Sequence, residues 1–273
     1  MDTTQLTQFH KDLAEWGIIL TSKQDEQFLK FYELLVEWNS FMNLTAITEF
    51  DEVMKKHFLD SLSFVHYLKK YGFISSEKNC NDELSKKALG EKSETIILDS
   101  LSKQEFTLID VGTGAGFPGI PLAILFPKAK FTLMDSLNKR IKFLNEVIEQ
   151  LELSNVETVH SRAEDLARNP RYRECYDYVV SRAVANLSTL SEYCLPFVKV
   201  EGKFISYKSE RLSEELTVAE KPITILGGLV KDQIDFKLPN SDIYRNLLVI
   251  QKMKSTSKKY PRKAGLPSKE PLI

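Results

Sequence analysis

An α/β fold with a mostly parallel, doubly wound sheet is predicted by the order of strand-like and helical segments after residue 105. From Phe106 onward, short runs rich in β-branched residues alternate with helical runs, as in βαβ units. The first two strands are expected in FTLIDV and KFTLMD, and a helix in NKRIKFLNEVIEQL. Segments near 230–238 and 246–253 flank the turn-rich PNSD, which predicts an antiparallel hairpin at the edge of the sheet.

A helical extension is predicted before the sheet, over residues 1–73, where no run alternates as a strand would. Ser22, with Asp25 three residues later, indicates the start of a second helix. A third helix is expected from Asp51 to about Tyr71. Apolar residues recur at steps of three or four, as on one face of a helix: Leu6, Phe9, Leu13 and Trp16, then Phe28, Phe31, Leu35 and Trp38.

Changes in composition divide the rest of the chain. Residues 74–105 are expected to be a flexible insertion, because twelve of residues 75–105 are charged and none is aromatic. Such a segment buries too little apolar surface to offset the entropy lost on ordering. Residues 106–254 then form the α/β domain, and residues 255–273 form a basic C-terminal tail.

The composition also argues against several protein classes. No run approaches the roughly 18 apolar residues of a membrane helix, and the polar N-terminus is unlike a signal peptide, so a cytoplasmic protein without membrane contact is expected. Cys80, Cys175 and Cys194 lack C-x-x-C spacing, which argues against a disulfide framework and against a zinc site. The formal net charge is −1, so a nucleic-acid partner would require a local basic patch.

A glycine-rich loop is the most informative motif. Gly112, Gly114 and Gly116 follow the first predicted strand, and Pro118 suits the first turn of a helix because that turn needs no amide hydrogen. Residues 114–119 also match the dinucleotide fingerprint G-x-G-x-x-G, with Asp135 at a compatible distance to bind a ribose. The glycines alone therefore leave two interpretations open, a methyltransferase that binds S-adenosylmethionine and a nicotinamide-dependent oxidoreductase.

Three features together favour S-adenosylmethionine. Asp110 stands two residues before Gly112, where a methyltransferase places a carboxylate near the cationic methionine end of the cofactor. Pro118 removes an amide donor that a pyrophosphate would use. The predicted terminal hairpin also matches the common methyltransferase sheet.

Three later positions are candidates for the same site. Asp135 ends the second predicted strand, where its two carboxylate oxygens fit ribose hydroxyls; the alternative is a helix cap. Ala163 and Glu164 follow the third strand, where an adenine edge would lie, although a capped short helix explains them nearly as well. Arg182 follows YDYVVS, at the strand end where ligands of open α/β sheets bind.

With these motifs in hand, the chain resembles the ribosomal RNA small subunit methyltransferase G family. The resemblance covers nearly all of the chain except residues 75–105, an insertion longer than the link expected in the family. It rests on seven segments: WNSFMNLTAIT, HFLDSLS, DVGTGAGFPGIPLAI, DSLNKRIKFL, SRAE, SRAVA and KKYPRKAGLPSKEPL. The loop is moderately specific, whereas the two N-terminal motifs and the tail together are strongly so.

The resemblance implies a Rossmann-like class I methyltransferase sheet, mostly parallel with an antiparallel last strand. It also implies methylation of N7 of one guanosine in the 530 loop of 16S rRNA, with free rRNA or the 30S subunit as partner, and a monomer is expected. Carried over by motif, the cofactor contacts fall on Gly112, Phe117, Asp135, Ser136, Leu137, Ala163, Glu164 and Arg182.

Guanine N7 already carries an unprotonated lone pair, so positional catalysis without a strong base is expected, with Arg182 as the candidate catalytic residue. Residues 243–269 contain eight basic and no acidic side chains, which predicts RNA contact; the alternative is a solvated tail without a partner. An alternative for the whole protein is a non-catalytic RNA-binding protein with a relic cofactor site. His57 and Asp60 share a helical face and could line the substrate cleft or form a structural pair. The RNA-contact candidates are His57, Asp60, Lys139, Arg140, Lys208, Lys258, Lys259, Arg262 and Lys263.

Overall fold

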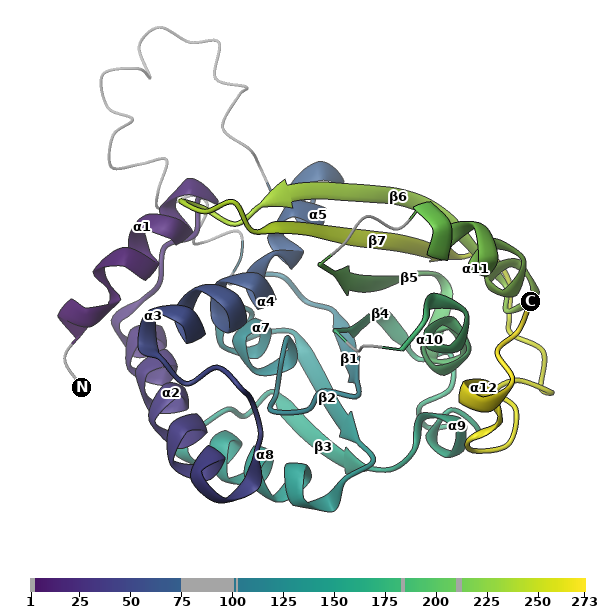
Figure 1. Cartoon of the computed structure of the whole chain (residues 1–273), viewed down its shortest axis with the longest axis horizontal. Coiled ribbons are helices and arrows are strands. Elements are labelled where there is room, and N and C mark those ends of the chain that lie inside the picture. Colours follow the sequence, from purple (N-terminus) through teal and green to yellow (C-terminus); the bar gives the residue numbers. More distant parts are fainter. Residues whose placement is uncertain (1–2, 75–100, 102, 183–184, 210–212) are drawn as a thin grey trace, which may run out of the picture.

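Seven strands form a single sheet in the order β3-β2-β1-β4-β5-β7-β6 (Figure 1). The computed structural model describes residues 3–74, 101, 103–182, 185–209 and 213–273. The expected flexible insertion, residues 74–105, lies almost entirely outside them. The strands are β1 (Thr107–Val111), β2 (Lys130–Asp135), β3 (Val156–His160), β4 (Tyr176–Ser181), β5 (Val198–Lys208), β6 (Gly228–Lys237) and β7 (Tyr244–Lys252).

The first five strands pair in parallel, and β7 lies antiparallel between β5 and β6. The predicted fold class is therefore confirmed: this is an α/β fold with a mostly parallel sheet and an antiparallel last strand. The predicted terminal hairpin is β6–β7. Because all five parallel strands point the same way, the residues that follow β1, β2, β3 and β4 meet at one edge of the sheet.

Eleven α-helical segments and three short helical turns accompany the sheet in the described residues. The helices are α1 (Thr7–Glu15), α2 (Ser22–Met42), α3 (Phe50–Val53), α4 (Asp60–Leu62), α5 (Phe64–Lys70), α7 (Gly119–Leu125), α8 (Asn138–Gln150), α9 (Ala163–Leu166), α10 (Leu187–Cys194), α11 (Ser213–Ile225) and α12 (Leu266–Lys269). The turns are a π-helical one over Met54–Leu59 and 3₁₀ ones over Thr3–Leu6 and Leu195–Phe197.

The two faces of the sheet carry separate apolar clusters because successive strand residues point to opposite sides. In β1, Leu108 joins a cluster with the N-terminal helices, α7 and α8, whereas Ile109 and Val111 join α9, α10, α11 and the tail. Figure 1 shows these two groups of helices on either side of the strands. The helical extension thus shares one continuous core with the sheet.

The extension begins as predicted but differs in detail. Thr21, rather than Ser22, caps α2. The Thr21 hydroxyl accepts from the Gln24 amide and the Gln24 side chain accepts from the Thr21 amide, which together form a capping box. The expected third helix is present but interrupted by the π-helical turn, which widens the helix by one residue. His57 lies in that turn, and Asp60 begins the α-helical segment after it.

In the part of the chain that the structure describes, no helix combines the length and apolarity needed to cross a bilayer.

His66 provides a test of this packing. Its ring lies 4.6 Å from Trp16 and 4.5 Å from Phe236 between ring centroids, and its Nε2 has no hydrogen-bond partner among the described residues. Burial, followed by the charge of Lys69, lowers its pKa to about 4. The neutral ring is therefore favoured in the folded state, and this contribution to stability is lost as the pH falls from about 6.5 to about 4.

Replacing the ring by phenylalanine should remove this titration and keep the stacking. We expect His66→Phe to lose less unfolding free energy than the original chain between about pH 7 and about pH 4.5, as measured by urea denaturation. An identical loss in both proteins would contradict the assignment.

Candidate active site

The glycine-rich loop leaves β1 at the carboxyl edge of the sheet and is anchored to β2. The amides of Gly112 and Thr113 donate to the carbonyl of Met134 at 3.0 and 3.1 Å. Gly112, Gly114 and Gly116 have φ values of +73°, +64° and +92°, a region that side chains disfavour. An added Cβ at Gly112 or Gly114 would meet nothing within 4 Å. The loop backbone is therefore open to a ligand on that side.

Asp110 holds the two ends of this loop together. Its side chain is fully buried, and Oδ2 accepts hydrogen bonds from the Thr113 hydroxyl at 2.7 Å and the Gly119 amide at 2.9 Å. Oδ1 has no hydrogen-bond partner among the described residues. Burial raises the pKa of this carboxyl to about 7, against the opposing effect of its two hydrogen bonds. One oxygen is structural, and the other is buried without a hydrogen-bond partner among the described residues.

The helix after the loop begins at Gly119, so Pro118 occupies the cap position rather than the first turn. Its missing amide still leaves this end of α7 without one donor. A Cβ on Gly119 would lie 2.2 Å from Leu133 Cδ2 and 3.0 Å from Asp110 Oδ2. Close packing against β2, and not a special φ, requires glycine here.

Asp135 joins the loop to the start of α8. Its carboxylate is 2% exposed; Oδ2 accepts from the Gly114 amide at 3.0 Å and from Arg140 at 3.1 Å, and Oδ1 accepts from the Leu137 amide at 2.9 Å. A carboxylate has about four acceptor positions, so about one remains for a ribose hydroxyl. These bonds leave Asp135 room to accept from about one ribose hydroxyl, and not from both as the sequence predicted. Leu137, not Asp135, caps α8.

The side chains after Asp135 are open to solvent. Ser136 is exposed and Leu137 is 44% exposed. Lys139 is also exposed, although its Nζ reaches the carbonyl of Met42 at 3.4 Å. Arg140 is tied to Asp135. Of the two basic residues predicted to contact RNA here, only Lys139 therefore has a charge without a carboxylate partner in the described structure.

Arg182 meets the helical extension at the end of β4. Its Nη1 donates to Asp60 Oδ2 at 2.9 Å and to the Lys56 carbonyl at 3.3 Å, and Nη2 lies 3.4 Å from His57 Nδ1. The guanidinium carbon also lies 5.1 Å from the centroid of the Phe117 ring. The structure thus brings Arg182 together with His57, Asp60 and the loop residue Phe117. The sequence predicted that His57 and Asp60 share a helical face, but not that they contact Arg182.

His57 is neutral in this cluster. Its ring stacks on Phe117 with centroids 4.7 Å apart, and Nε2 lies 2.7 Å from the Thr45 hydroxyl. Burial, and then the charge of Arg182, lowers the His57 pKa to about 4. At neutral pH, His57 therefore adds no charge to this cluster, and the Asp60 carboxylate is shared by two cations, Arg182 and Arg245.

Two further predicted residues have partners within the fold. Glu164 is buried in α9, and its Oε1 accepts from the Gly265 amide of the tail at 2.8 Å. The short helix α9 exists, but no side chain caps it. Ala163 is buried beside Glu164. Lys208 pairs with Glu215 at 2.9 Å and is 13% exposed, so its charge is already neutralised.

The C-terminal tail follows a fixed course over α9 and α10. The guanidinium and backbone amide of Arg262 all bond to Glu192, with Arg262 Nη2 2.8 Å from Oε2, and Glu192 is 1% exposed. The Thr189 hydroxyl donates to the Pro267 carbonyl at 2.9 Å. Arg262 is thus a structural anchor. The other predicted tail contacts are exposed: Lys258, Lys259 and Lys263.

Comparisons with known proteins assign the chain to a family. The model described as rRNA small subunit methyltransferase G matches residues 24–75 and 78–244. The chain belongs to this family. A ribosomal RNA small subunit methyltransferase G of Lachnoclostridium phytofermentans is 48% identical over 265 residues, covering 97% of this chain and 96% of the relative. The protein of that name from Alkaliphilus oremlandii is 50% identical over 269 residues, covering 96% and 98%.

Solved structures show weaker similarity. A methyltransferase from Pyrococcus furiosus is 21% identical with a TM-score of 0.43, covering 59% of this chain and 82% of its own. The fibrillarin pre-rRNA processing protein of Methanococcus jannaschii is 14% identical with a TM-score of 0.44, covering 56% and 70%.

Several residues of this family member were missed by sequence reasoning. Thr45 orients His57, Arg245 donates to Asp60 Oδ1 at 2.8 Å, and Glu192 anchors Arg262. Thr45 lies in a quoted motif, which could have pointed to it. Arg245 belongs to the basic run over 243–269, which predicted RNA contact and not a bond to Asp60, and no local pattern marks Glu192.

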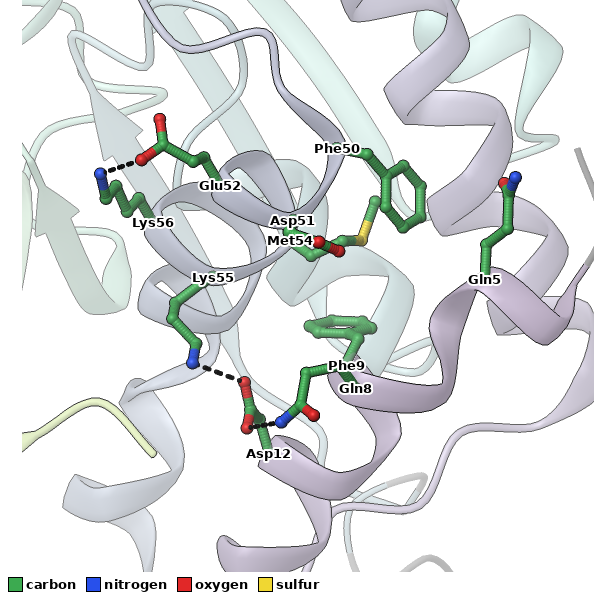
Figure 2. A pocket seen from close by; sticks show the side chains of 10 residues that line it. All are labelled: Gln5, Gln8, Phe9, Asp12, Phe50, Asp51, Glu52, Met54, Lys55 and Lys56. Carbon is green, nitrogen blue, oxygen red and sulfur yellow. Dashed lines mark hydrogen bonds and ion pairs between the residues drawn. The ribbon is translucent and has the colours of Figure 1, made fainter. Parts of the chain in front are cut away.

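A pocket of about 250 Å³ lies in the helical extension. Figure 2 shows Lys55 and Gln8 both reaching Asp12 at its rim, at 3.2 and 2.8 Å. Its lining combines these polar groups with Phe9, Phe50 and other side chains of the extension. No group of three or more metal-binding side chains occurs within the described ranges.

Substitution of Gly119 tests the close packing under the loop. Gly119→Ala should lower the free energy of unfolding by about 2 kcal/mol or more, because the Cβ overlaps Leu133 and crowds Asp110. Gly72→Ala is the matched control, since its Cβ meets no atom and only its φ of +74° opposes the change, at a cost of about 1 kcal/mol. Urea denaturation measures both, and equal losses would refute the steric argument.

Substitution of Arg262 tests the tail anchor. Arg262→Ala leaves the buried Glu192 carboxylate without its partner, which should cost about 3–5 kcal/mol of stability. Adding Glu192→Gln should recover part of this loss because the uncompensated charge is gone. Lys263→Ala, one residue later and exposed, should change stability by at most about 0.5 kcal/mol. An Arg262→Ala protein as stable as Lys263→Ala would show that the anchor is not significant.

Proposed function

We propose that this chain transfers a methyl group from S-adenosylmethionine to N7 of a guanosine in the 530 loop of 16S rRNA. The observation that carries the proposal is the open backbone of the glycine loop between Asp110 and Asp135, at the carboxyl edge of a methyltransferase sheet. Membership of a family described as rRNA small subunit methyltransferases supports the reaction and the class of RNA.

The donor set suits this cofactor. Asp110 offers one unpartnered carboxylate oxygen in a buried position, and an acceptor there favours a cationic ligand over a pyrophosphate. Asp135 retains about one acceptor position for a ribose hydroxyl. The exposed Leu137 and the backbone of α9 at Ala163 supply apolar and polar surface for adenine. When bound, the cofactor supplies an electrophilic methyl group.

The protein's contribution to the reaction is positional. Guanine N7 is a lone-pair acceptor and requires no base to remove a proton. We assign Arg182 to orientation of the reacting groups, because Asp60, the Lys56 carbonyl and Phe117 fix its guanidinium. Because His57 is neutral and Asp60, which also binds Arg245, offsets part of the positive charge, the charge that opposes attack by N7 is reduced. Alignment at near-attack distance can supply several kcal/mol.

We assign the exposed lysines of the C-terminal tail to contacts with the RNA. Lys258, Lys259 and Lys263 extend from a tail whose inner side is anchored at Glu192 and Glu164. Cations held on a fixed support bind phosphates with a smaller loss of entropy than cations on a free arm. We further propose that the protein is a cytoplasmic monomer that acts on 16S rRNA or on the 30S subunit.

Mapping of N7-methylguanosine in 16S rRNA, with and without the protein, tests the reaction. Arg182→Ala and Asp135→Ala should each weaken S-adenosylmethionine binding by about 10-fold or more, the effect expected for loss of a charge-assisted hydrogen bond. Isothermal titration measures both, with the exposed Lys221→Ala on α11 as control. Tight binding of NADH without binding of S-adenosylmethionine would instead support an oxidoreductase, and binding of rRNA without methyl transfer would indicate a relic site.

A further inference from the structure

Phe41 is an exposed aromatic side chain at the end of α2 that the mechanism does not use. It is 66% exposed, yet it does not project freely into solvent. Its ring lies 5.4 Å from that of Trp38, which in turn lies 5.6 Å from Phe143 of α8. The Phe41 ring thus packs on Trp38, a partly buried residue that in turn packs on the buried Phe143.

The position of Phe41 connects it to the candidate active site. The next residue, Met42, accepts from Lys139 at the start of α8, and α8 begins three residues after Asp135 at the carboxyl edge of the sheet. Asn39 Oδ1 accepts from the Thr45 amide at 2.9 Å, and the Thr45 hydroxyl contacts His57. The end of α2 is therefore linked both to the cofactor side and to the Arg182 cluster.

The charges around Phe41 favour a polyanion on one side. Lys139 and Lys142 are exposed on the first turns of α8, which contain no acidic residue. Glu37 is exposed four residues before Phe41, toward the middle of α2, whereas the charge of Glu33 on the same helix is offset by Lys30. A phosphate backbone is repelled along that helix and attracted toward α8, so a polyanion is directed across the end of α2.

We propose that the Phe41 ring stacks on an unpaired RNA base next to the methylated guanosine, while Lys139 and Lys142 contact the flanking phosphates. The inference rests on the proposed function, because it takes the RNA substrate as given. Proteins that recognise unpaired RNA stack its splayed bases on aromatic side chains and hold the backbone with cations. The supported ring, the adjacent lysines and the link to His57 supply both requirements beside the site.

The test measures methyl transfer from labelled S-adenosylmethionine to 30S subunits and to 16S rRNA, both from cells lacking the enzyme. Phe41→Ala should raise KM for RNA by about 5- to 100-fold, the range for loss of one base stack. Its kcat at saturating RNA and its Kd for S-adenosylmethionine should not change. Phe41→Tyr and Phe41→Trp should retain the original KM because both keep an aromatic face.

Two controls separate stacking from other apolar contacts. Val218→Ala removes a side chain of similar exposure, 59%, from α11, and should leave KM unchanged. Phe41→Leu keeps apolar area without an aromatic face and should behave much like Phe41→Ala. A normal KM in Phe41→Ala, or in Phe41→Leu, would overturn the proposal.

The result also distinguishes this inference from the proposed function. If the unmodified chain methylates rRNA and Phe41→Ala does so with the same KM, only the stacking is wrong. If the unmodified chain transfers no methyl group, the proposed function itself fails. Light scattering tests whether a second copy of the chain, and not RNA, covers Phe41. A dimer that Phe41→Ala converts to a monomer would overturn RNA stacking at this ring.

Discussion

The Asp60 carboxylate is the contact on which the geometry of the site depends. It is 4% exposed and accepts from Arg182 at the end of β4 and from Arg245 on β7, one oxygen to each. A buried carboxylate needs both partners, because an unpaired charge in the interior is strongly destabilising. The helical extension, the parallel part of the sheet and its antiparallel edge are therefore fixed relative to one another by one side chain.

This contact joins the helical extension to the candidate site. The π-helical turn carries His57, and the helical segment after it carries Asp60; the Tyr207 hydroxyl of β5 also donates to the Ser61 carbonyl at 2.9 Å. His57 then stacks on Phe117 of the glycine loop. The extension thus contacts the loop through His57, while Asp110 and Asp135 bind the loop backbone from the sheet. The shape of the loop and the position of Arg182 therefore depend on the same packing.

The fold and the loop could be predicted from sequence because their signals are local. Alternating strands and helices reveal βαβ units, and glycines between Asp110 and Asp135 mark a ligand loop within a few residues. The side-chain partners could not be predicted in this way. Arg245 is 185 residues from Asp60, Gly265 is 101 residues from Glu164, and Arg262 is 70 residues from Glu192. Such pairs are defined only when folding brings distant segments together.

The same limit applies to the basic residues. A charge pattern counts cations but does not show which have a carboxylate in the fold. Lys252 is fully buried against Glu174, and Lys208 is paired with Glu215. The exposed lysines left after such pairing are a subset of the basic residues, and they include Lys258, Lys259 and Lys263 on the tail and Lys139 and Lys142 at the start of α8. A chain with a formal net charge of −1 can therefore still present cations to RNA.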